Sequence, residues 1–125
     1  MSILIKSAKI IDANSKFNGK TQDILITNGK IKEIAPSIPN SKAKEIINQT
    51  NLHVSPGWLD SSVCFGEPGL EERETLVNGA KTASLSGFTD IILNAVTDPY
   101  LDTKADISYI KSKSSEFVTN IHPTG

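Results

Sequence analysis

The sequence predicts an α/β protein in which a small β-sandwich-type domain, residues 1–55, precedes parallel β/α units over residues 56–125. Two observations predict this arrangement. The first half alternates apolar and polar residues and contains Asn-Gly turns, a pattern typical of antiparallel strands. The second half, after Pro56-Gly57, alternates short apolar strands with segments of helical periodicity, which is typical of βαβ units.

The first half is predicted to be strands joined by tight turns. Residues 3–11 carry β-branched side chains separated by lysines, which indicates a half-buried strand. Residues 23–33 form the strongest local signal, because Asn28-Gly29 lies between two alternating apolar runs and predicts a hairpin. The polar segment 36–51 is expected to be a loop with one short strand at 45–47.

The second half is predicted to alternate strands and helices, in the order strand 58–65, helix 71–85, strand 88–96, helix 103–114 and strand 117–121. Three glutamates open the first helix at the positive end of its dipole, and Gly87 follows it as a C-terminal glycine. Thr103 and Asp106 have the spacing of a capping box for the second helix. This order predicts a parallel sheet.

The composition excludes several classes of function. Lys and Arg number 13 against 14 Asp and Glu, so the chain lacks the basic excess of a nucleic-acid-binding protein. One cysteine rules out an internal disulfide framework and fits a reducing, cytoplasmic location. The apolar runs are too short for a signal peptide core or a membrane span. We therefore expect neither nucleic acid nor membrane as a partner.

Residues 56–69 carry the informative motif, PGWLDSSVCFGEPG. This stretch resembles dihydroorotases and related cyclic amidohydrolases, whose first barrel strand usually reads P-G, two hydrophobic residues, D-x-H-x-H, one hydrophobic residue, R-[ED]-P-G. Arg73-Glu74 matches the family's basic residue and glutamate, and residues 86–89, SGFT, resemble its G-G-F-T. Residues 94–99, NAVTDP, align with M-P-N-T-x-P at the end of the next strand.

The resemblance implies a fold and a chemistry. Family members place a small β domain before a metal-dependent (β/α)₈ barrel, with zinc in the active members. They include the dihydroorotases of pyrimidine biosynthesis. Because a complete barrel takes about 250 residues, we expect the 125 residues to hold only its first strands and helices.

The resemblance also implies that the functional positions have been replaced. Residues two apart on a strand point to the same side, so the family's two histidines reach one metal, which activates water. Ser62 and Cys64 occupy these ligand positions, and the substrate-binding arginine and asparagine are replaced by Gly66 and Val96. We therefore predict no catalytic residues, no intact metal or substrate site and no cofactor in this chain.

Other polar residues have simpler explanations. Asp60 and Glu67 match framework positions, and carboxylates near strand ends usually accept hydrogen bonds from loops or caps. His53 and His122 fall outside the family's ligand positions and are interpreted as loop or packing residues. A single cysteine such as Cys64 usually behaves as a small apolar residue.

Three functional hypotheses remain open. The first is a catalytically inactive dihydroorotase-like protein (a pseudoenzyme) that holds a pathway enzyme such as aspartate transcarbamoylase or an active dihydroorotase, or that forms a homodimer. The second is an active cyclic-amide hydrolase, of dihydroorotase or hydantoinase type, with metal ligands beyond residue 125. The third is a scaffold unrelated to pyrimidines.

Overall fold

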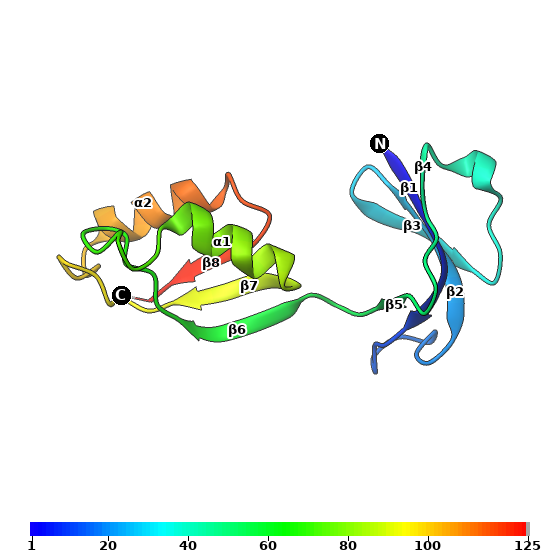
Figure 1. Cartoon of the computed structure of the whole chain (residues 1–125), viewed down its shortest axis with the longest axis horizontal. Coiled ribbons are helices and arrows are strands. Elements are labelled where there is room, and N and C mark those ends of the chain that lie inside the picture. The colour runs from blue at the N-terminus through cyan, green and yellow to red at the C-terminus, as the bar shows by residue number, and fades with distance from the viewer. Residues whose placement is uncertain (125) are drawn as a thin grey trace. The chain divides into compact units, whose positions relative to one another are not determined.

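The computed structural model describes residues 1–124, which form two compact units, Met1–Pro56 and the part that begins at Gly57 (Figure 1). The first unit contains strands and one turn of 3-10 helix, whereas the second contains three strands and two α-helices. Each unit has its own buried apolar side chains.

The first unit is one five-stranded sheet with the order β3-β2-β1-β4, in which β5 also pairs with β1. Its elements are β1 Ser2–Ile10, β2 Thr21–Thr27, β3 Lys30–Ala35, the 3-10 turn Asn40–Lys42, β4 Glu45–Ile47 and β5 His53–Val54. Asn28 and Gly29 join β2 to β3 with φ values of 51° and 73°, which confirms the predicted hairpin and its turn residues. Apolar side chains are buried on both faces, since Ile24 and Leu25 are consecutive strand residues in different clusters.

A buried carboxylate holds an irregularity in β1. The pairing with β2 shifts between Ile5 and Ala8, and Ser7 at this bulge has a φ of 52°. Asp23 Oδ1 accepts a hydrogen bond from the Ser7 backbone N–H at 2.8 Å. Because a bulge turns its N–H groups away from the ladder, the Asp23 carboxylate supplies the acceptor that the partner strand does not.

The second unit is a parallel sheet in the order β6-β7-β8, with both helices packed on one face (Figure 1). Its elements are β6 Trp58–Val63, α1 Leu76–Leu85, β7 Phe88–Leu93, α2 Lys104–Ser114 and β8 Asn120–Pro123. The core between sheet and helices contains Phe65, Leu76, Ala80, Ile91, Leu93, Leu101, Ile110 and Ile121. The predicted order of strands and helices is present.

Helix α1 begins later than predicted. The prediction of a helix over 71–85 was wrong at its start, because residues 66–74 form successive turns and α1 begins at Leu76. The N-cap is Thr75, whose hydroxyl accepts a hydrogen bond from the Asn78 backbone N–H. The three glutamates therefore precede the helix instead of lying in its first turn. Gly87, with a φ of 89°, follows the helix as predicted.

The strands are shorter than predicted. The predicted strands 58–65 and 88–96 stop at Val63 and Leu93, and the third begins at Asn120 instead of residue 117. The third strand starts late because residues 115–117 donate hydrogen bonds back to α2 carbonyls and continue its last turn. The second helix starts as predicted, since Thr103 and Asp106 form a capping box.

Neither helix of the described residues, at 10 and 11 residues, has the length and apolar character needed to cross a membrane.

Candidate functional site at the ends of β6 and β7

The residues predicted to occupy the family's metal-ligand positions, Ser62 and Cys64, lie near the point where β6 and β7 end. The two strands are parallel, so their carboxyl ends meet at one edge of the sheet. The Asn94 backbone N–H donates to the Val63 carbonyl oxygen at 2.9 Å, which fixes the first residue after β7 beside the end of β6. Polar side chains from both strand ends are therefore held next to one another.

Ser62, Cys64 and Asn94 form a hydrogen-bonded cluster at this edge. Asn94 Nδ2 donates to Ser62 Oγ at 3.0 Å and contacts Cys64 Sγ at 3.7 Å. The structure therefore brings the two predicted positions together and adds a third residue. Sequence reasoning misses Asn94, although one signal points to it, namely a polar residue that directly follows a buried strand.

The three residues do not fit a zinc ion. Zinc binds lone pairs of thiolate, imidazole or carboxylate groups, usually three or four of them. A serine hydroxyl is a weak ligand, and an amide N–H₂ is a donor without a lone pair for a cation. Within residues 1–124, no three His, Cys, Asp or Glu side chains lie close enough to hold a metal together. These three side chains therefore do not provide a zinc site.

The two predicted substrate positions, Gly66 and Val96, differ in the room that they leave for a side chain. Gly66 is buried, its N–H donates to the Glu74 carbonyl and its own carbonyl accepts from the Leu70 N–H. A Cβ at position 66 would lie 1.7 Å from the Leu70 carbonyl oxygen. Val96, in contrast, is 45% exposed. The loop after β6 is therefore built around a glycine, whereas position 96 accepts other side chains.

The loops after β6 and β7 are joined through their backbones. The Asp98 N–H donates to the Pro68 carbonyl at 3.3 Å. Gly69 has a φ of 94°, and a Cβ there would lie 1.6 Å from the Asp98 carbonyl oxygen. Only glycine satisfies both the positive φ and the close approach. The Pro-Gly of the motif therefore serves to join these two loops.

The remaining carboxylates of the motif have local structural partners. Asp60 accepts a hydrogen bond from the Ser62 N–H at 3.0 Å. Glu67 accepts from the Leu76 N–H at the start of α1 and from the Tyr109 hydroxyl. Burial, followed by the charge of Glu67, raises the pKa of Tyr109. The contacts of Asp60 and Glu67 are those of loop and cap acceptors.

The two histidines belong to different units. His53 is on β5, where Nδ1 lies 2.8 Å from the Asn51 carbonyl oxygen. His122 is on β8 and pairs with Asp90 of β7, with Nε2 2.8 Å from Oδ1. Asn120 also donates to Asp90 Oδ1, at 3.1 Å. Sequence reasoning places neither Asp90 nor this cross-strand pairing, because parallel register is not visible in the sequence.

The Asp90 cluster gives a pH prediction. Hydrogen bonds from His122, then Thr89 and Asn120, hold the pKa of Asp90 below its ordinary value of 3.8. Because the pKa of Asp90 is lowered in the folded state, its ionised form stabilises the fold above pH 3.8. This contribution is lost as the pH falls through the folded-state pKa. We expect the Asp90 carboxyl carbon, followed by NMR, to titrate at lower pH in the wild type than in His122→Ala. Equal midpoints in the two proteins would contradict the pairing.

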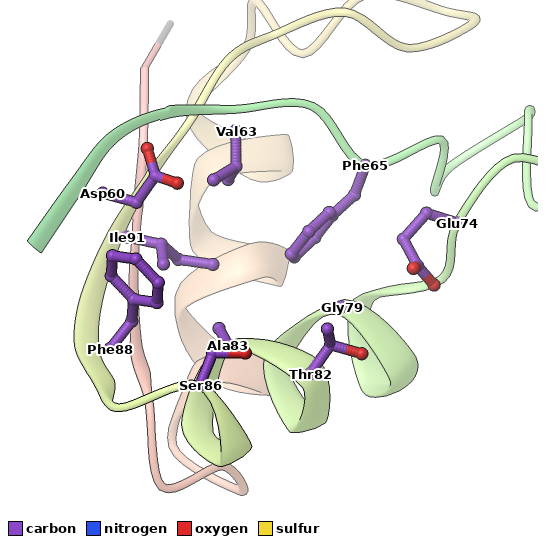
Figure 2. Close-up of a pocket in the computed structure, with 10 residues that line it drawn as sticks. All are labelled: Asp60, Val63, Phe65, Glu74, Gly79, Thr82, Ala83, Ser86, Phe88 and Ile91. Atoms are coloured by element: carbon purple, nitrogen blue, oxygen red, sulfur yellow. The ribbon is translucent and has the colours of Figure 1, made fainter.

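A hollow of about 200 Å³ lies between the sheet and α1 of the second unit (Figure 2). Figure 2 shows the Phe65 ring pointing from the segment after β6 toward Gly79 of α1. The hollow is lined by Asp60, Val63, Phe65, Glu74, Gly79, Thr82, Ala83, Ser86, Phe88 and Ile91. Its two carboxylates accept hydrogen bonds from Ser62, Thr75 and Asn78. Ser62, Cys64 and Asn94 are not among the lining residues, so the hollow is separate from their cluster.

Solved structures share this fold. The chain superposes on an L-hydantoinase from Arthrobacter aurescens with a TM-score of 0.81 and 21% identity, covering 98% of this chain and 27% of that one. A dihydroorotase structure gives a TM-score of 0.64 at 16% identity, with coverages of 98% and 30%. The fold is thus that of the N-terminal part of an amidohydrolase: a small β domain followed by the first β/α units.

The sequence relatives carry one shared name, dihydroorotase. The chain is 35% identical to a dihydroorotase of Trichlorobacter lovleyi over 126 residues, which cover 100% of this chain and 29% of the relative. It is 37% identical to a dihydroorotase of Clostridium botulinum over 123 residues, with coverages of 98% and 30%. No protein-family model matches the chain. Over its whole length the chain is similar to dihydroorotases, and it spans less than a third of the length of these relatives.

Proposed function

We propose that this chain is part of a dihydroorotase-like protein of pyrimidine biosynthesis that does not hydrolyse dihydroorotate. The observation that carries the proposal is the Ser62, Cys64 and Asn94 cluster, in which an amide N–H₂ faces both residues at the expected ligand positions. In active members of the family, zinc would supply the activated water. This chain offers a hydrogen-bonded cluster of a hydroxyl, a thiol and an amide in its place.

The proposed role is that of a scaffold for an active pathway enzyme, such as aspartate transcarbamoylase or a functional dihydroorotase, in the cytoplasm. Two features support this role. The framework residues of the motif keep structural contacts, such as the Glu67 hydrogen bond to the start of α1. The positions tied to catalysis have changed instead. Retention of fold without the chemical groups is what a binding role requires.

One observation favours an active hydrolase as a second candidate. Relatives at 33–37% identity carry the name dihydroorotase, and about 70% of their length lies outside the match. Ligands in that remaining part could build a metal site without Ser62 and Cys64. Such a protein would hydrolyse dihydroorotate or a related cyclic amide.

The test uses the full-length protein that contains this chain. We expect no metal-dependent turnover of dihydroorotate, hydantoin or dihydropyrimidine after zinc is supplied, together with co-purification of a transcarbamoylase or an active dihydroorotase. Robust zinc-dependent hydrolysis with one bound metal per chain would refute the proposal and establish the second candidate. Binding to a partner outside the pyrimidine pathway, without turnover, would instead support a scaffold of another kind.

A further inference from the structure

We infer that Asn94 takes the place of a metal ion, so that its amide group cross-links Ser62 and Cys64 and excludes divalent cations from the strand ends. This inference rests on the proposed function and adds to it a device within the fold. The juxtaposition that carries it is one side-chain nitrogen in contact with both a hydroxyl oxygen and a sulfur, at 3.0 and 3.7 Å.

The position of Asn94 is set by the backbone. Its N–H donates to the Val63 carbonyl, and Val63 lies between the two residues that the side chain contacts. Leu93, the last residue of β7, is fully buried and pairs with Val63, so the chain enters position 94 from a fixed point. The side chain therefore reaches its two partners from a rigid strand end, as a cross-link requires.

The chemistry of the amide opposes a cation. Its two N–H hydrogens match the two acceptors one for one, so each hydrogen faces an atom whose lone pairs a metal would need. The positive ends of the N–H dipoles also repel a cation placed between the same atoms. The Ser62 and Asn94 side chains carry no charge that would attract a cation.

The substitution Asn94→Asp tests the inference, since it exchanges the donors for a carboxylate of similar shape. With Co²⁺ as the probe, we expect the wild-type chain to bind no more tightly than Cys64→Ser. We expect Asn94→Asp to bind about tenfold more tightly and to show thiolate-to-cobalt absorption that disappears when Cys64→Ser is added. Asn94→Leu removes the donors without adding a ligand, so it should bind Co²⁺ more tightly than the wild type and less tightly than Asn94→Asp.

A second measurement does not depend on any variant at position 94. The side-chain N–H₂ signals of Asn94 should shift in the NMR spectra of Ser62→Ala and Cys64→Ser, whereas those of Asn78 on α1 should stay unchanged. Thiolate-to-cobalt absorption in the wild type would overturn the inference. Asn94 side-chain signals whose chemical shifts stay the same in both variants would overturn it as well. Turnover by the full-length protein alongside shifted Asn94 signals would remove the proposed function and leave the inference standing.

Discussion

Replacement of Asp23 by asparagine is expected to destabilise the first unit by about 3–5 kcal/mol, the usual cost of removing one partner of a buried ion pair. The Asp23 side chain is 2% exposed, and Lys6 Nζ lies 2.5 Å from Oδ2. Oδ1 accepts from the Ser7 N–H and Oδ2 from the Ile38 N–H, each at 2.8 Å. An asparagine has one acceptor oxygen, so its N–H₂ would face at least one of these donors.

Urea denaturation measures this loss, with Glu33→Gln as the matched control. Glu33 also pairs with a lysine, Lys42 at 2.7 Å, but both side chains are more than a third exposed. An exposed pair contributes about 0–1 kcal/mol, so the control should unfold close to the wild type. If Asp23→Asn unfolded at the same urea concentration as the control, the structural role of Asp23 would be disproved.

Because of the Asp23 carboxylate, we also expect the unfolding free energy to fall at acidic pH. Burial alone would raise the pKa of this carboxyl, but hydrogen bonds from Lys6, Ser7 and Ile38 outweigh it and hold the pKa below 3.8. Because the pKa of Asp23 is lower in the folded state than in the unfolded state, its ionised form stabilises the native state at pH values above the unfolded-state pKa. This contribution is lost as the pH falls through the folded-state pKa. The wild type should therefore lose stability below pH 3.8 more steeply than Asp23→Asn. Parallel curves of unfolding free energy against pH would contradict this expectation.

Replacement of Gly66 by arginine, the residue that the family motif carries here, is expected to destabilise the second unit by about 2–3 kcal/mol, because it overpacks a closed loop. A Cβ at this position would lie 1.7 Å from the Leu70 carbonyl oxygen. That oxygen accepts a hydrogen bond from the Arg73 N–H, and Gly66 is itself hydrogen-bonded to Glu74 and Leu70. Backbone hydrogen bonds therefore hold the loop at both residues that would clash. Restoring the arginine should therefore disturb the loop instead of restoring an anion-binding side chain.

The control for Gly66→Arg is Val96→Asn, which introduces the family motif's residue at the other predicted substrate position. Val96 is 45% exposed, so the polar replacement should change the unfolding free energy by less than about 0.5 kcal/mol. Thermal unfolding of both variants, followed by circular dichroism, makes the comparison. Similar melting temperatures for Gly66→Arg and the wild type would show that the loop can open to accept a side chain.

Local signals in the sequence predicted much of the secondary structure. The Asn28-Gly29 turn and the Thr103–Asp106 capping box depend on residues within four positions of each other, so their chemistry is visible in the sequence itself. The start of α1 was not predicted correctly. The glutamates before it have helical propensity, but Glu67, nine residues before Leu76, accepts that residue's N–H, and Thr75 caps the helix.

The sequence by itself determined the order of strands and helices and the resemblance to the family motif, with the four positions that differ from that motif, because these follow from residue type and spacing. The tertiary structure alone decided what the replacements do. Parallel pairing of β6 and β7 places Asn94 against Ser62 and Cys64, about thirty residues away in the chain. The same pairing sets Asp90 beside His122, and the loop fold closes on Gly66. Contacts of this kind depend on strand register and backbone path, which residue type and spacing do not specify.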